Sequence, residues 1–149
     1  MRRAIELAQA SVQRGGGPFG AVVARAGRIV AEGANEVTLA RDPTAHAEIV
    51  AIRAACQALN DFKLTGCSIY TSCEPCPMCL GAIYWSRAER LIFAATRADA
   101  AGAGFDDDLI YREIALPIAG RKLASTQSMR DESLAVFRAW ASSPVRREY

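Results

Sequence analysis

The sequence has only one histidine, His46, so a site built within a single chain cannot draw on two imidazole groups. Basic and acidic residues nearly balance, at 18 against 16, and the net charge of +2 is too small to imply a nucleic-acid partner. No apolar run approaches the roughly 20 residues that a membrane-spanning helix needs. We therefore expect a soluble, cytoplasmic protein without a membrane anchor.

The cysteines form an odd set, and three of the five fall between residues 73 and 79. An odd number crowded in this way is a poor framework for disulfides. It is more typical of metal chemistry in a reducing compartment. The five are Cys56, Cys67, Cys73, Cys76 and Cys79.

His46, Cys76 and Cys79 together supply three side chains of the kinds that bind zinc. Cys76 lies 30 positions after His46 (76 − 46), and the carboxylate of Glu48 lies two positions after it. A structural zinc site uses four protein ligands, whereas a catalytic site keeps one position open for water. Three ligands without a second histidine therefore predict a catalytic zinc ion.

Glu48 is the candidate general base at this centre. Zinc lowers the pKa of a bound water molecule to about 7, which makes hydroxide available at neutral pH. A carboxylate beside that water can take its proton and deliver it to a substrate nitrogen. The expected chemistry is hydrolysis.

The chain is expected to form one domain of residues 1–149, in which strands alternate with helices. This alternation predicts an α/β sandwich. Helices are predicted at about 5–12, 46–60, 77–85, 106–114 and 134–140, and strands at 20–24, 28–31, 67–71 and 90–94, with a loop at 35–44. The helix at 77–85 is apolar nearly all round and is expected to be buried. The apolar stripes of the first two helices are predicted to pass through Ile5, Leu7, Ala8 and Val12, and through Ile49, Ile52, Cys56 and Leu59.

Both candidate metal-binding segments fall at predicted helix starts. Cys76 and Cys79 are three residues apart, so their sulfur atoms lie on the same side of a first helical turn. Pro75 and Pro77 suit that turn, where backbone donors have no partner within the helix. The helix dipole also favours thiolate, the form of cysteine that binds metal. His46 can face the two thiols from the start of the other helix.

Two other interpretations of the cysteines must be weighed. A Cys-x-x-Cys pair alone is weak evidence for a catalytic zinc site, because redox motifs and partial zinc knuckles also contain it. A structural zinc site would need Cys73 or Cys67 as its fourth ligand. We expect Cys73 to point away, because Glu74-Pro75 keeps it outside the helix. The combination of His-Ala-Glu with Pro-Cys-x-x-Cys is the signature of zinc nucleobase deaminases.

The sequence resembles the cytidine-deaminase-like fold and, within it, the small guanine deaminases of bacteria. The zinc motif alone indicates the wider superfamily, and the later Gly-Phe-Asp-Asp and terminal Glu-Tyr segments narrow the resemblance to this branch. The resemblance weakens only between Pro117 and Leu134. Its segments are 16–22, 35–38, 42–48, 70–85, 99–101, 104–107 and 148–149.

This resemblance implies a three-layer α/β/α fold with a mixed central sheet of about five strands. It implies zinc ligands at His46, Cys76 and Cys79, and a proton shuttle at Glu48. It further implies a homodimer that exchanges the C-terminal segment at about 131–149. The implied substrate-binding groups are the ring of Phe19, the side chain of Asn35, the backbone amide of Ala47, and the side chains of Asp107 and Tyr149.

The implied reaction is the hydrolytic deamination of guanine at C2, which gives xanthine and ammonia and uses zinc as the cofactor. Related substrates remain open, namely guanosine or an aminotriazine such as ammeline. A tRNA adenosine deaminase shares the zinc motif, but the region after the last motif strand leads into an acidic run, a poor phosphate contact. We therefore expect a small purine base and no nucleic acid as the partner.

Sequence patterns alone give three of these residues simpler explanations. The acidic run 106–108 is favoured at a helix N-terminus by the helix dipole. Phe19 could be ordinary core packing, and Tyr149 could belong to a frayed tail. Only the resemblance places them at the substrate.

Overall fold

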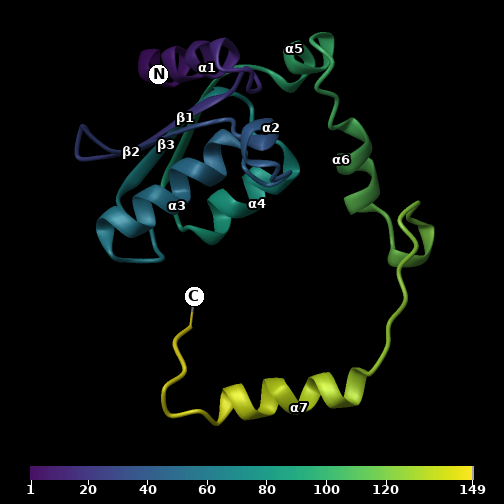
Figure 1. Cartoon of the computed structure of the whole chain (residues 1–149). Helices are drawn as coiled ribbons and strands as arrows, with labels where there is room; N and C mark the ends of the chain where they lie inside the picture. Colours follow the sequence, from purple (N-terminus) through teal and green to yellow (C-terminus); the bar gives the residue numbers. More distant parts are fainter. Residues whose placement is uncertain (149) are drawn as a thin grey trace. The chain divides into compact units, whose positions relative to one another are not determined.

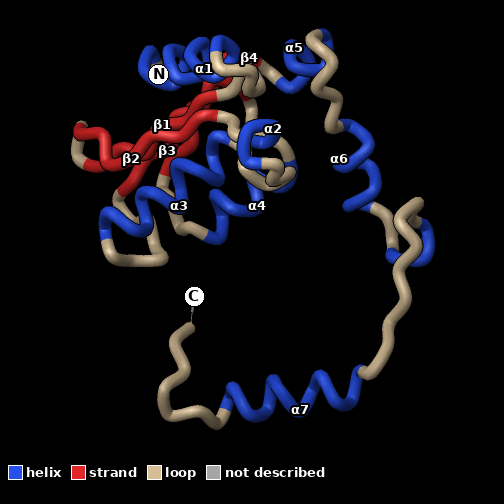
Figure 2. The backbone as a smooth tube through the Cα atoms, in the orientation of Figure 1, coloured by secondary structure: helices blue, strands red, loops and turns tan. Residues whose placement is uncertain are grey.

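The computed structural model describes residues 1–148, which divide into two compact units at residue 107. The first unit, residues 1–107, contains a mixed sheet (Figure 2) with the strand order β2-β1-β3-β4. Strand β1 (Gly20–Arg25) pairs antiparallel with β2 (Arg28–Ala34) and β3 (Cys67–Cys73), and β4 (Arg90–Ala95) runs parallel to β3. That residues 1–149 form one domain stays a prediction.

The mixed sheet confirms the predicted α/β class, with four strands among the described residues instead of about five. After β4 the described chain continues through helices and connecting segments, so residues 96–148 add no strand to the sheet. Helix α1 (Arg2–Gln13) covers one face of the sheet, whereas α3 (Ala47–Leu59) and α4 (Pro77–Trp85) cover the other (Figure 1). This gives the expected three layers.

Strand glycines allow the helices to lie very close to the sheet. A methyl group added at Gly33 would lie 2.2 Å from the carbonyl oxygen of Ala47 and 2.6 Å from the amide nitrogen of Ala51, both in α3. Gly20 has the same relation to α1, where the nearest atom is the carbonyl oxygen of Ala4 at 2.2 Å. The start of α3, which carries His46, is therefore set directly against β2.

This close approach corrects the predicted apolar stripes. In α1 the buried residues are Ala4, Ala8 and Ser11, while Ile5 and Val12 are exposed. In α3 the small residues Ala51 and Ala55 are fully buried, and the larger side chains of the predicted stripe are only partly buried beside them. A helix that lies against a strand at a glycine has room only for small side chains at the point of contact.

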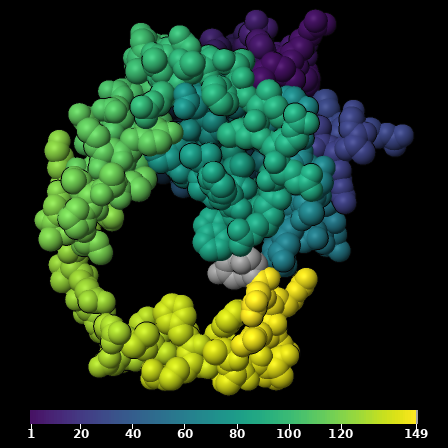
Figure 3. Space-filling model, turned by 180° about the vertical axis from the view of Figure 1, so that it is seen from behind, coloured from purple at the N-terminus to yellow at the C-terminus, as the bar shows by residue number. Residues whose placement is uncertain are grey.

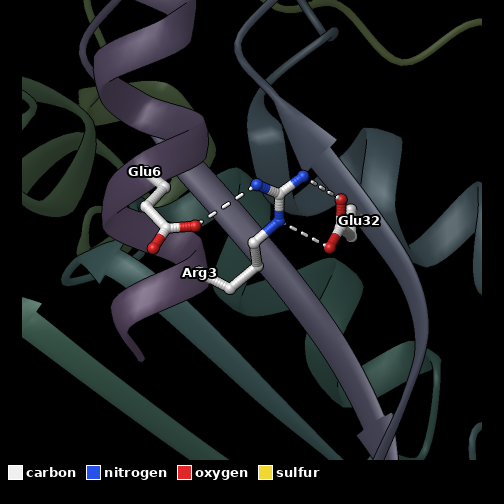
Figure 4. A network of polar contacts seen from close by, with 3 residues as sticks. All are labelled: Arg3, Glu6 and Glu32. Carbon is white, nitrogen blue, oxygen red and sulfur yellow. Dashed lines mark hydrogen bonds and ion pairs between the residues drawn. The ribbon is translucent and has the colours of Figure 1, made fainter.

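An ion-pair network joins α1 to the edge strand β2 (Figure 4). The Nε and Nη2 atoms of Arg3 donate to the two carboxylate oxygens of Glu32 at 2.7 and 2.8 Å. The Nη1 atom of Arg3 donates to Glu6 at 3.3 Å. These contacts raise the pKa of Arg3 and lower the pKa of Glu32. They hold the first turn of α1 over β2.

Two short helices and one exposed surface differ from the sequence predictions. Helix α2 (Val37–Ala40) lies within the predicted loop, and α5 (Arg97–Gly102) follows β4 where no helix was predicted. Helix α4 has the predicted bounds, but it is not buried throughout. Its residues Cys79 and Ile83 are buried, whereas Tyr84 and Trp85 are largely exposed.

The second unit begins at residue 108 and contains α6 (Asp108–Ala115), the short 3₁₀ helix η1 (Ile118–Gly120) and α7 (Arg130–Ala141). The predicted helices at 106–114 and 134–140 are thus confirmed with shifted ends. Its surface, coloured from green to yellow in Figure 3, exposes large apolar side chains. They include Leu109, Ile110, Ile114, Val136, Phe137 and Trp140. Among residues 1–148, no helix combines the length and apolar character that crossing a membrane requires.

Candidate zinc centre and active site

The three predicted zinc ligands meet where α3 and α4 begin. His46 is the N-cap of α3 and Cys76 is the N-cap of α4, both with extended backbone, while Cys79 lies in the first turn of α4. The Nδ1 atom of His46 lies 3.6 Å from the Sγ atom of Cys76 and 3.5 Å from that of Cys79. All three ligand atoms lie within 4.8 Å of one another.

These separations fit a tetrahedral zinc ion. With Zn–N of about 2.0 Å and Zn–S of about 2.3 Å, tetrahedral angles place nitrogen and sulfur ligands about 3.5 Å apart. The two observed distances between His46 and the cysteines match this value. Among the described residues, the donor set consists of these three side chains. It therefore fits a zinc ion that keeps a fourth position for a substrate or water.

The two thiols share a proton in a way that prepares them for metal binding. A hydrogen bond from Cys79, together with one from His46, lowers the pKa of Cys76 to about 4. The same bond between the cysteines raises the pKa of Cys79. The hydrogen bond to Cys76 also raises the pKa of His46. Cys76 is thus a thiolate, and zinc binding would release the proton that Cys79 still carries.

Glu48 lies in the first turn of α3 and is 8% exposed. Burial is the main cause that raises its pKa, and the neighbouring charge of Cys76 raises it further. Its carboxyl group also shares a hydrogen bond with Cys79. A buried carboxyl group beside the zinc ligands, with a raised pKa, is suited both to accept and to donate a proton.

Cys73 lies outside the ligand set. Its thiol donates to the carbonyl oxygen of Thr96 at 3.5 Å, and burial raises its pKa. Cys67 is fully buried in the hydrophobic core. The expectation that Cys73 points away from the metal agrees with these contacts, and the group of three is not extended to a fourth cysteine.

Asn35, a predicted substrate-binding residue, connects its own segment at the start of α2 to the loop that carries Gly17. Its Oδ1 atom accepts hydrogen bonds from the backbone amides of Gly17 and Val37, each at 3.3 Å. Because both partners are N–H donors, the oxygen must face them and the side-chain NH₂ group must point elsewhere. Asn35 can therefore offer a hydrogen-bond donor to a ligand.

The other predicted substrate residues are placed as follows. Phe19 is half-buried next to the core, and Ala47 is the first residue of α3, where a backbone N–H has no partner within the helix. Partial burial raises the pKa of Asp107, and the charge of Cys76 raises it further. Tyr149 lies outside the described residues.

Phe105 was missed as a candidate by sequence reasoning. Its ring lies 4.9 Å from that of Phe19, centroid to centroid, and the two planes are nearly perpendicular at 86°. One signal was available in the sequence. Thr96 and Asp99 form a Ser/Thr-x-x-Asp/Glu capping box, which predicts the start of the helix that leads to Phe105.

Residues 1–95 match the family model described as the cytidine and deoxycytidylate deaminase zinc-binding region. The guanine deaminase of Bacillus subtilis is 51% identical over 150 residues, which cover 100% of this chain and 96% of that protein. The X-ray structure of a Bacillus subtilis guanine deaminase superposes with a TM-score of 0.96 at 52% identity and covers 99% of this chain and 95% of that one.

Two further relatives are less similar. A structure of guanine deaminase from Nitrosomonas europaea gives a TM-score of 0.69 at 32% identity and covers 93% of this chain and 80% of that one. The tRNA-specific adenosine deaminase of Aquifex aeolicus is 41% identical over 95 residues, which are 64% of this chain and 63% of that protein. The chain therefore belongs to the family of zinc-dependent cytidine and deoxycytidylate deaminases, and the similarity that spans its whole length is to a guanine deaminase.

Proposed function

We propose that the protein hydrolyses guanine to xanthine and ammonia. The main support for this proposal is the share of the chain that is similar to each of two kinds of deaminase. The similarity to guanine deaminase spans the whole chain, whereas that to a tRNA-specific adenosine deaminase spans 64% of it. Both kinds of enzyme carry the zinc motif, so the motif does not distinguish their substrates. The remaining third of the chain, which only the alignment with guanine deaminase covers, favours guanine as the substrate.

Glu48 is the group that moves protons in this reaction. Water adds to C2 of guanine, and Glu48 accepts one of its protons and delivers it to N3. Glu48 then accepts the second proton and delivers it to the exocyclic amine, so that the C2–N bond breaks and ammonia leaves. Zinc, when bound by His46, Cys76 and Cys79, lowers the pKa of that water. The burial of Glu48 and its hydrogen bond with Cys79 support this role.

The substrate-binding residues that the family resemblance implies offer complementary groups for the ring. The Phe19 ring provides an aromatic face for stacking. The NH₂ group of Asn35 and the amide of Ala47 donate to ring acceptors such as N7 and O6, while the carboxylate of Asp107 accepts from the N–H edge. Tyr149 completes recognition in this proposal, as the family resemblance implies.

We also place the protein in the cytoplasm, where it breaks down purines as a homodimer with exchanged C-terminal segments. The exposed apolar side chains of α6 and α7 support a partner for the second unit, because monomeric soluble proteins seldom leave large apolar patches uncovered. The five cysteines, none in a disulfide, support a reducing compartment.

Ammonia release from guanine, guanosine, ammeline, adenine and cytosine tests the proposed reaction. We expect the highest kcat/KM with guanine and formation of xanthine in equal amount. The matched control is Glu48→Gln, which keeps the shape of the side chain but cannot shuttle protons. It should retain zinc and lose at least about 100-fold in kcat.

A preference for guanosine or ammeline would contradict the assignment of the substrate but not that of the site. Activity of Glu48→Gln within a few-fold of the wild type would instead contradict the role of Glu48. Zinc content measured on both proteins separates loss of the metal from loss of the proton shuttle.

A further inference from the structure

The backbone on either side of the Phe19 ring is held by hydrogen bonds from three segments. The Phe19 amide donates to the carbonyl of Gly17 at 2.8 Å, and the Phe19 carbonyl accepts from the amide of Asn35 at 3.0 Å. The next amide, that of Gly20, donates to the hydroxyl of Ser72 at 3.0 Å. These bonds fix the Cα–Cβ direction of Phe19. They do not fix the rotation of its ring, which needs a contact on the side chain itself.

Phe105 provides such a contact. The ring centroids of Phe19 and Phe105 lie 4.9 Å apart with an interplanar angle of 86°. This is the edge-to-face arrangement that aromatic pairs prefer. Phe105 is 45% exposed, so burial in the core contributes little to holding its side chain in place. Both residues belong to the first unit.

The end of α5 determines where Phe105 lies. The amide of Gly104 donates to the carbonyl of Ala101, and the amide of Phe105 donates to that of Ala100, both at 3.0 Å. Gly104 has φ +91°. This pattern is a Schellman motif, with glycine at the left-handed position and Phe105 directly after it. The apolar residue at this place commonly packs on its own helix, whereas here its ring packs on Phe19.

The start of α5 is tied to the segment that carries the zinc ligands. Thr96 and Asp99 form a capping box, with the Thr96 amide donating to Asp99 at 2.8 Å. The amide of Arg97 donates to the carboxylate of Glu74 at 3.0 Å, and Glu74 lies two residues before Cys76. Helix α5 is thus fixed at both ends, and it links the cysteine segment to the aromatic pair.

We propose that Phe105 is a positioning residue for the deamination reaction, holding the Phe19 ring at the angle at which a purine stacks on it. This inference rests on the proposed function. Phe105 does not take part in proton transfer, and its loss should therefore weaken the binding of the ring in the ground state and the transition state alike. Such a change raises KM and leaves kcat nearly unaltered.

Steady-state kinetics with guanine test the proposal on three variants. Phe105→Ala removes the ring and should raise KM about three- to tenfold, in keeping with the strength of an aromatic pair, with kcat changed less than about twofold. Phe105→Leu keeps apolar volume without an aromatic ring and should behave like Phe105→Ala. Phe105→Tyr keeps the aromatic ring and should restore KM to within about twofold of the wild type.

Phe62→Ala is the matched control, because Phe62 is also a half-exposed aromatic residue in a loop. It follows the far end of α3, about 20 Å along the helix from His46. Zinc content and Tm are measured on every variant. If Phe105→Ala does not fold, the comparison of Phe105→Leu with Phe105→Tyr decides the question.

An unchanged KM in both Phe105→Ala and Phe105→Leu would overturn the proposal. So would an equal rise of KM in Phe105→Tyr or in Phe62→Ala, or a fall in kcat without a change in KM. These outcomes differ from failure of the proposed function. In that case the wild type and Phe62→Ala would release no ammonia from guanine, although both contain zinc.

Discussion

At the scale of single residues, the direction of the Asn35 amide decides what this side chain can recognise. Its oxygen is engaged by the amides of Gly17 and Val37, so only its NH₂ group remains for a ligand. An aspartate at this position could still accept both backbone hydrogen bonds, but it could not donate one. The substitution Asn35→Asp therefore separates the loop contacts from substrate recognition.

We predict that Asn35→Asp keeps a Tm near that of the wild type and raises the KM for guanine at least about tenfold, because a donor is lost and an acceptor of the ring faces a carboxylate. Asn35→Ala should lower both Tm and affinity, since it also removes the acceptor for the amides of Gly17 and Val37. Thermal unfolding and steady-state kinetics check both effects.

Asn60→Asp is the control for this change of charge, because Asn60 is an exposed residue at the far end of α3. It should leave KM unchanged. A KM for Asn35→Asp equal to that of the wild type would show that Asn35 does not donate to the substrate.

The zinc centre could be predicted from the sequence, whereas the orientation of Asn35 could not. His46, Cys76 and Cys79 are recognisable because few side chains bind zinc and because helix starts bring such ligands together. The direction of the Asn35 amide depends on the amide of Val37, two residues along the chain, and on the amide of Gly17, 18 residues away. The role of Phe105 depends in the same way on a contact with a residue 86 positions away (105 − 19).

At the scale of elements, Gly33 sets the distance between β2 and the start of α3. A methyl group at this position would meet backbone atoms of Ala47 and Ala51 at 2.2 and 2.6 Å, and backbone atoms cannot rotate away. We predict that Gly33→Ala lowers the free energy of unfolding by about 1–3 kcal/mol, as overpacking does elsewhere. Because Ala47 directly follows His46, the variant should also retain less zinc.

Gly81→Ala is the matched control, because Gly81 lies within α4 and a methyl group added there would meet no atom within 4 Å. Replacing a helical glycine by alanine there should leave the stability unchanged or raise it by about 0.5–1 kcal/mol. Chemical denaturation and metal analysis of both variants give the comparison. A Gly33→Ala protein as stable as the wild type would mean that α3 can move away from β2 at no cost.

The same glycines explain which parts of the fold the sequence could predict. The alternating strands and the helix at 77–85 were predicted well, because their apolar patterns and flanking prolines are local. The predicted apolar stripe of α1 was wrong at Ile5 and Val12. The periodic pattern assigns large apolar residues to the buried face, whereas the close contact with Gly20 buries the small residues Ala4 and Ala8. Helix α5 was missed although the Thr96–Asp99 capping box is a local signal for its start; the contact of Arg97 with Glu74, 23 residues away, could not be predicted from the sequence.

At the scale of the whole molecule, the proposed dimer with exchanged C-terminal segments makes a prediction that mixed variants can test. The zinc ligands, Glu48 and the described substrate residues all belong to residues 1–107. The proposed recognition residue Tyr149 belongs to the C-terminal part, which in our proposal is exchanged between subunits. An exchanged dimer has a consequence that an ordinary dimer lacks, because each site then needs groups from two chains.

We predict that two inactive variants restore activity when they are co-expressed and purified as a mixed dimer. One subunit carries Glu48→Gln and an intact C-terminus, and the other keeps Glu48 but lacks Tyr149. In an exchanged dimer, the site that contains Glu48 receives the intact segment of its partner. Random pairing should then give about a quarter of the wild-type number of active sites.

In a dimer without exchange, every site of this mixture would lack either Glu48 or Tyr149, so activity would stay at the level of the separate variants. Guanine turnover is measured on the mixture and on each variant alone, and light scattering establishes that the particles are dimers. Full activity of the variant that lacks Tyr149 would instead show that this residue is not needed for recognition of guanine. Recovery in the mixture is expected only where the intact C-terminal segment and Glu48 come from different chains, which makes it direct evidence for a shared site.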